Sequence, residues 1–166
     1  MNRAQRRKLN ASRGHGKSLI KTNTLMYANK LFDPIEQFLN DCMTGYLAHL
    51  DDGCILAYVD KASMVSKSRI DVKQHIEGVF RLVDEVIRSL SVSEKAISAE
   101  IILMYTHGKD CLMHRIIPEI LAKDEPELCR SDITKARNTI EWARQLIATT
   151  PKSVLAPVVT SMLGYQ

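Results

Sequence analysis

Apolar residues recur at helical spacing along most of this 166-residue chain. The clearest stretch starts at Asp33 and Pro34, residue types that suit the N-cap and the first turn of a helix. Its apolar residues lie three and four positions apart, at Ile35, Phe38, Leu39, Cys42, Met43, Tyr46, Leu47 and Leu50. Because that spacing lines one face of an α-helix, we predict a core helix that ends at Asp51-Asp52-Gly53.

The same period predicts further helices between short turns. They cover about residues 24–32, 68–90, 94–107, 111–117 and 132–149, with one or two helical turns after Pro151. Their caps and stops are expected at Ser68 with Asp71, Ser91 with Ser93, Gly108, Asp110 and Ser131. Short connections between amphipathic helices are typical of antiparallel bundles. The predicted fold class is therefore all-α, a compact antiparallel multi-helix bundle over residues 23–166 with a basic N-terminal arm.

One apolar run, Cys54–Val59, has no clear period, because helices and strands both accommodate a run of this length. Ile55, Tyr58, Ala62 and Val65 share one face if the segment is helical. We read it as helix, with a strand as the alternative.

The basic segment at residues 1–22 is the part that we call the N-terminal arm. The first 32 residues hold eight Lys and Arg and no carboxylate, whereas residues 33–166 hold 15 Lys and Arg against 19 Asp and Glu. The net charge of +4 therefore originates in the arm, above a weakly acidic body. Such a charge asymmetry indicates a nucleic-acid or anionic-surface partner for the arm, and nucleic acid, RNA or DNA, is the partner that we expect.

Within the arm, residues 3–9 favour helix, and Gly14-His15-Gly16 predict a flexible joint. Arg and Lys neutralise phosphates, and Asn10 can hydrogen-bond to a base edge. The nucleic-acid-binding residues that we predict are Arg3, Arg6, Arg7, Lys8, Asn10, Arg13, Lys17 and Lys21. Wound at 100° per residue, Arg3, Arg6, Arg7 and Asn10 share one arc, with Arg13 at its margin and Lys8 off it.

The run Asn2-Arg3-Ala4-Gln5-Arg6-Arg7-Lys8 resembles the arginine-rich peptide motifs with which some phage antitermination proteins bind RNA hairpins. The resemblance is mostly compositional and does not extend into the body. No aromatic residue precedes Tyr27, so the arm has no platform on which the bases of a single strand can stack.

Residues 11–18 fit a relaxed phosphate-loop pattern, with Ala11 in place of the first glycine and Lys17-Ser18 at its end. A true phosphate loop follows a buried apolar strand, whereas basic residues precede this one. We therefore do not expect a nucleotide-hydrolysing site here.

A weak zinc candidate lies near the middle of the chain. His107, Cys111 and His114 are spaced i, i+4, i+7, and Cys129 offers a fourth ligand. Gly108 and Asp110 are expected to interrupt a helix at that point, so we interpret these side chains as ordinary core and surface residues. We predict no metal and no cofactor.

The cysteines form no CxxC pair, which is typical of reduced thiols in a cytosolic chain. Residues 1–21 lack the apolar run of a signal peptide, and no stretch reaches the ~18 apolar residues of a membrane span. We expect a soluble protein without a membrane partner, cytoplasmic or virion-associated. An arginine-rich, acid-poor start is also typical of a mitochondrial transit peptide, which is the competing interpretation.

Together these features favour a non-enzymatic nucleic-acid-binding protein of the kind of a small phage or bacterial transcription regulator. Its arm is expected to bind RNA or DNA, and its helical body a protein partner. The alternative is a structural or assembly protein, such as a virion component, whose arm packs on neighbouring subunits or on the genome. An enzyme comes third, because the sequence holds no recognisable nucleophile or metalloprotease motif.

Overall fold

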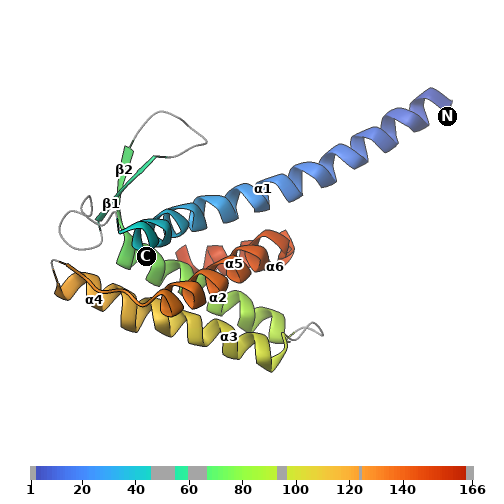
Figure 1. Ribbon diagram of the computed structural model, residues 1–166. Helices are drawn as coiled ribbons and strands as arrows, with labels where there is room; N and C mark the ends of the chain where they lie inside the picture. Colours follow the sequence, from blue (N-terminus) through green and yellow to red (C-terminus); the bar gives the residue numbers. More distant parts are fainter. Residues whose placement is uncertain (1–2, 46–54, 60–66, 93–96, 124, 164–166) are drawn as a thin grey trace.

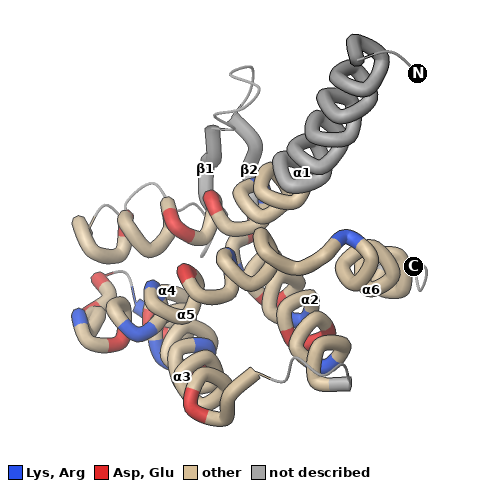
Figure 2. The backbone as a smooth tube through the Cα atoms, turned by 90° about the vertical axis from the view of Figure 1, so that its right-hand side faces the viewer, with Lys and Arg blue, Asp and Glu red and all other residues tan. Residues whose placement is uncertain are grey.

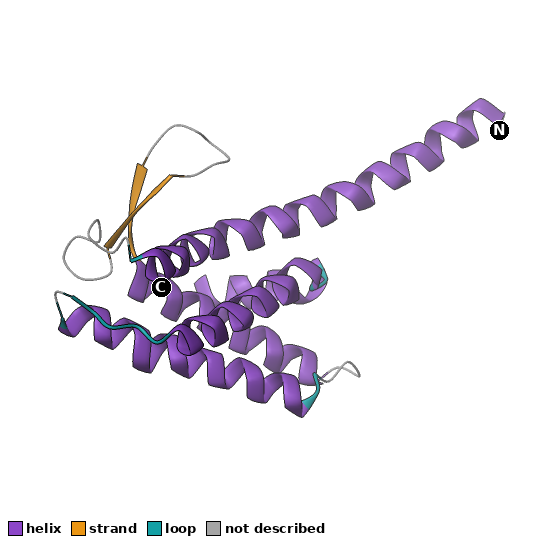
Figure 3. Cartoon of the chain, viewed as in Figure 1, coloured by secondary structure: helices purple, strands orange, loops and turns teal. Residues whose placement is uncertain are grey.

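The computed structural model of the protein describes residues 3–45, 55–59, 67–92, 97–123 and 125–163. At residues 3–23, 55–59, 67–70, 92 and 163 it describes the backbone alone. The helices along these residues are α1 (Arg3–Thr44), α2 (Val72–Val92), α3 (Ala99–Asp110), α4 (Ile117–Ala122), α5 (Arg130–Thr149) and α6 (Lys152–Leu163) (Figure 1). Two strands, β1 (Ile55–Val59) and β2 (Lys67–Asp71), come between α1 and α2 in the chain and project to one side of the helices (Figure 3).

A π-helix, Cys111–Ile116, joins α3 to α4 without a break, so these three segments form one rod. Within the described residues, five helical rods therefore pack against one another (Figure 1). The all-α class that the helical period predicts is confirmed for the packed body.

The strands pair as a two-stranded antiparallel sheet, with Ile55 opposite Asp71 and Val59 opposite Lys67. The helix that we predicted over Cys54–Val59 is therefore wrong at residues 55–59. β-branched and aromatic residues favour strands, and this run is rich in them. Its pairing partner lies eight or more residues further along the chain, so no period within the run reveals it.

The sheet also shifts the start of the next helix. Ser68, which we expected at the helix start, lies in β2, and α2 begins at Val72. The side chain of Asp71 accepts a hydrogen bond from the backbone N–H of Gln74 over 3.2 Å. Asp71 is therefore the residue that caps α2.

α1 is a single helix of 42 residues. It passes through Gly14-His15-Gly16, where we expected a joint, and through Asp33-Pro34, where we expected a helix start. A glycine inside a helix costs only about 1 kcal/mol, which good helix formers on either side offset. The helix ends at Thr44, and Gly45 follows with a φ of 75°, a conformation that glycine adopts readily. The end that we predicted at residues 51–53 lies outside the described residues.

Pro34 is buried within α1. A proline cannot donate a hydrogen bond to the carbonyl four residues earlier, which weakens that turn of the helix. His75 of α2 lies against the same turn, and its Nε2 donates to the carbonyl oxygen of Leu31 over 2.7 Å. The turn around the proline is thus held from outside by the neighbouring helix.

α3 runs past the stop that we predicted at Gly108, because this glycine makes a close contact between helices. A Cβ atom added to Gly108 would lie 2.6 Å from the carbonyl oxygen of Lys135 and would overlap the hydroxyl of Thr139. That hydroxyl donates to the carbonyl of Met104 over 3.2 Å. Glycine at this position lets α3 and α5 approach more closely than any side chain would allow.

The π-helix accounts for the other misplaced boundary in this rod. Pro118 cannot donate to the carbonyl of His114, four residues earlier. The Ile117 N–H instead donates to the carbonyl of Leu112, five residues back. The helix therefore continues, and Asp110 is an interior residue and not the cap that we predicted.

Two further caps differ from the predicted ones. The side chain of Ser98 accepts a hydrogen bond from the Ile101 N–H and caps α3. Ser91 lies within α2, and its hydroxyl donates to the carbonyl of Ile87 over 2.8 Å. α5 has Cys129 at its N-cap, two residues before Ser131.

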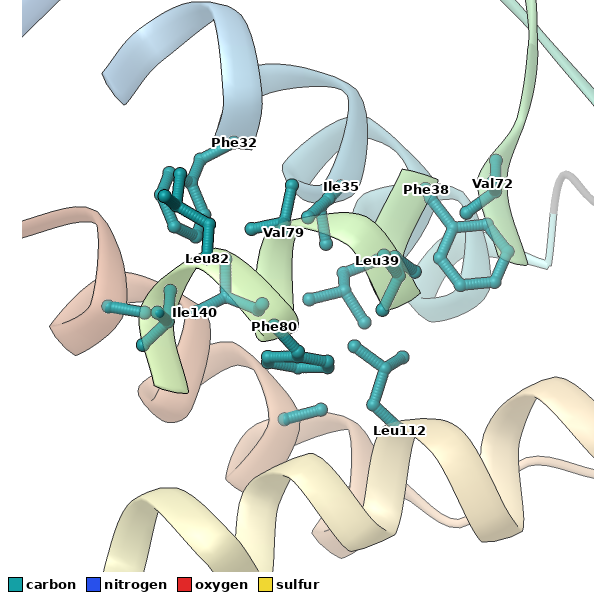
Figure 4. Close-up of a cluster of buried hydrophobic side chains, with 14 of the residues drawn as sticks. Phe32, Ile35, Phe38, Leu39, Val72, Val79, Phe80, Leu82, Leu112 and Ile140 are labelled. Carbon is teal, nitrogen blue, oxygen red and sulfur yellow. The ribbon is translucent and has the colours of Figure 1, made fainter. Parts of the chain in front are cut away.

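One apolar cluster holds the rods together (Figure 4). Its completely or almost completely buried side chains come from four of the rods and include Phe32, Ile35, Phe38, Leu39, Ile76, Val83, Leu112, Ile133, Ile140 and Ile147. Each such side chain contributes about 1.5–3 kcal/mol relative to an exposed one.

Tyr105 connects this cluster to a polar contact between α2 and α3. Its ring centroid lies 6.0 Å from that of Phe80 and 5.4 Å from that of Trp142. Its hydroxyl donates to Asp84 Oδ1 over 2.7 Å, and Lys109 Nζ donates to Asp84 Oδ2 over 2.7 Å. Burial and the Asp84 acceptor raise the pKa of Tyr105, so the phenol keeps its proton as a donor.

Alanine substitutions at two glycines inside helices should change the free energy of unfolding in opposite directions. Gly108→Ala should lower the free energy of unfolding by about 1–3 kcal/mol or more, since the new methyl group overpacks the contact between α3 and α5. Gly78→Ala should raise it by about 0.5–1 kcal/mol, because nothing lies within 4 Å of the added Cβ and alanine favours helix. Urea denaturation of the two variants measures both changes, and equal changes would contradict the close approach at Gly108.

Candidate nucleic-acid interface

The part of α1 that follows the arm, residues 29–36, is fixed by one arginine of α5, and we call this part the root of the arm. Arg144 Nη1 donates to Asn29 Oδ1 over 3.1 Å and to Asp33 Oδ1 over 2.8 Å, and Nη2 donates to Glu36 Oε2 over 2.7 Å. The Arg144 side chain is only 15% exposed, so it is enclosed by these contacts with α1. Asp33 is thus an acceptor for another helix and not the N-cap that we predicted.

A second arginine sets the register between the same two helices. Arg137 Nη2 donates to Asn40 Oδ1, so a residue seven positions before Arg144 meets a residue seven positions after Asp33. α1 and α5 are therefore antiparallel. The same register places Thr149, the last residue of α5, beside Ala28. α1 thus runs on toward the N-terminus beyond the end of α5, and Figure 1 shows this part of the helix extending away from the other rods.

The buried face of α1 defines a direction around the helix. Thr24, Ala28, Phe32, Ile35 and Leu39 recur every three or four positions, and all are buried. The side chains of residues 3–23 lie outside the described set, but their positions on this helix follow from its period of roughly 100° per residue.

Seven of the eight predicted binding residues occupy positions in phase with that buried face. They fall within roughly 120° of one another on a continuous helix and are Arg3, Arg6, Arg7, Asn10, Arg13, Lys17 and Lys21. We call these seven positions the basic stripe. Lys8 falls on the opposite side, as does Lys30. Because we expected a flexible joint at Gly14-His15-Gly16, we did not predict that Lys17 and Lys21 belong to this stripe. Only an unbroken helix brings these two positions into phase with the others.

The body carries charges of both signs, interspersed along its helices (Figure 2). Several of them form ion pairs, such as Arg115 with Asp132 at 3.2 Å and Lys123 with Glu119 at 2.8 Å. A depression of about 690 Å³ between α2 and α6 is lined by Arg81, Asp84, Glu85 and Arg88 among others. Glu85 and Arg88 pair with each other at 3.1 Å, and Asp84 is held by Lys109.

The four zinc candidates occupy one rod and the start of α5. Cys111 is buried, and its thiol lies 3.7 Å from Asp132 Oδ1. Burial and the Asp132 charge raise the pKa of this thiol. His107, His114 and Cys129 are exposed. Among the described residues, no three His, Cys, Asp or Glu side chains gather as a metal site would require.

Residues 11–18, which fit the relaxed phosphate-loop pattern, lie within α1. A phosphate loop wraps its backbone N–H groups around the phosphates, whereas helical N–H groups bond along the helix. The segment does not have the backbone conformation of such a loop.

No protein-family model, curated protein or solved structure matches this chain. In the part of the chain that the structure describes, no helix is both long and apolar enough to cross a bilayer.

Removal of the arginine that holds the root of the arm should destabilise the body. Arg144→Ala leaves Asp33 and Asn29 without their partner, and a loss of about 1–3 kcal/mol in the free energy of unfolding is expected. Arg88→Ala is the matched control, since its pair with Glu85 is 73% and 41% exposed and such pairs contribute little. Losses of similar size in thermal or urea unfolding would show that the contact between α1 and α5 does not depend on Arg144.

Proposed function

We propose that the chain is a non-enzymatic nucleic-acid-binding protein of the kind of a small phage or bacterial transcription regulator. The basic stripe binds the phosphates of RNA or DNA, and the helical body binds a protein partner. The proposal rests on one observation: a helix that is continuous over Arg3–Thr44 has seven of the predicted binding residues, from Arg3 to Lys21, at positions within one arc. No carboxylate interrupts them, so their charges add along a phosphate backbone.

The second candidate is a structural or assembly protein whose arm packs on neighbouring subunits or on the genome. The exposed apolar residues of the body favour it. Leu103 on α3 is 71% exposed, and Leu25 and Met26, beside the root of the arm, are 50% and 58% exposed. Apolar side chains at such positions suit contacts with another protein.

A pair of lysine variants tests the proposal. Lys17→Ala and Lys8→Ala each remove one charge from the same arm, but position 17 lies on the basic stripe and position 8 lies opposite it. We expect Lys17→Ala to weaken binding to nucleic acid several-fold and Lys8→Ala to change it little. Fluorescence anisotropy with labelled RNA and DNA measures both affinities.

A salt titration of each variant supplies the control. The slope of log K against log salt should fall by about 0.9 on duplex DNA, or about 0.7 on a single strand, for each phosphate that the variant no longer neutralises. Only Lys17→Ala should show that fall. Equal small reductions of affinity in both variants would favour packaging by charge alone, as the assembly function requires, and no binding by the full chain would contradict the proposal.

A further inference from the structure

We propose that the nucleic acid is a duplex and that it lies in the corner between the basic stripe and the turn from α5 to α6, where Lys152 contacts its phosphate backbone. This inference rests on the proposed function and adds the form of the ligand and a contact on the body.

The corner follows from the phase of α1. The basic stripe is in phase with Ala28, Phe32 and Ile35, which are completely buried against the body. A ligand on that stripe therefore lies on the body side of the helix. The ligand meets the end of the bundle at the point where α1 extends beyond the other helices.

The register between α1 and α5 identifies the part of the body that stands there. Thr149, the last residue of α5, is level with Ala28, so the turn through Thr150 and Pro151 to Lys152 starts beside the last buried turn of α1, which begins at Thr24. The carbonyl of Leu146 accepts hydrogen bonds from both the N–H and the hydroxyl of Thr150, over 2.9 Å and 2.6 Å, which fixes the direction of the turn. Lys21, the nearest position of the basic stripe, comes one helical turn before Thr24.

Lys152 has the charge and the exposure that the contact needs. It is the first residue of α6 and is exposed. Within the described part of the chain it has no ion-pair partner, in contrast to Arg144, Arg115 and Lys109. Its ammonium group is therefore available to a phosphate.

The length and composition of the arm favour a duplex over a single strand. From Arg3 to Lys21 the stripe is roughly 27 Å long, at 1.5 Å per residue. A straight array with its charges on one side suits a stiff duplex, whose phosphates carry a high density of negative charge along its axis. Single-strand binding relies on aromatic side chains for stacking, and none precedes Tyr27.

The test compares two charge reversals in the full chain, Lys152→Glu and Lys30→Glu. Lys30 is exposed and lies on α1 opposite the basic stripe, so its reversal changes the net charge equally without touching the corner. The probes are a short blunt DNA duplex, the RNA duplex of the same sequence and one strand of each. We expect Lys152→Glu to lower duplex affinity several-fold and to reduce the salt slope by about 0.9, and Lys30→Glu to do neither.

Each outcome decides the proposal. Duplex binding that is weakened by Lys152→Glu alone supports it. Equal effects of the two reversals, or tighter binding of the single strands, would overturn the corner and leave the proposed function standing. No binding of any probe by the wild-type chain would overturn both. Circular dichroism of each variant shows that the exposed substitution leaves the helices intact.

Discussion

The arrangement of this molecule depends on the seam between α1 and α5. The guanidinium of Arg144, 15% exposed, donates to Asn29, Asp33 and Glu36 across that seam. Such charge-assisted hydrogen bonds are directional, so they fix the register of α1 along α5 and the rotation of α1 about its own axis. The apolar side chains beneath them supply most of the stabilisation. Because the seam sets the rotation of α1, it also sets the direction in which the basic stripe lies when the helix leaves the bundle.

The helices around this seam continue through glycine and proline residues at specific positions. Gly108 brings α3 against α5, and the π-helix before Pro118 carries the same rod onward without a break. Pro34 weakens one turn of α1, and His75 of α2 bonds to the carbonyl of Leu31 in that turn. In each case a residue type that often ends a helix packs against a neighbouring helix or is bypassed by a local change in hydrogen bonding. The rods therefore run past residues that would otherwise end them.

The apolar period predicted the core helices, the all-α class and the buried face of α1 from Ile35 to Cys42. It could not predict the pairing of β1 with β2, which joins segments that share no local signal. Several helix ends that we predicted from glycine, proline and capping residues are absent, at Gly14, Asp33 and Gly108. At these positions contacts or helix-forming residues elsewhere in the chain outweigh the local propensity. The candidate binding residues followed from the charges of the arm and from the hydrogen-bonding capacity of Asn10. Their common phase with the core did not, since it requires the unbroken helix through Gly14 and Gly16.

We propose that one unbroken helix carries the phase of the core into the arm, so that the basic stripe and the body face the same ligand. Insertion of alanines between Lys21 and Thr22 tests it directly, since two residues rotate the arm by roughly 200° and four by only about 40° beyond a full turn. Affinity for a DNA duplex should fall sharply with two inserted alanines and stay near the wild-type value with four. Equal affinities of the two insertion variants would show that binding does not depend on the rotation of the arm relative to the body.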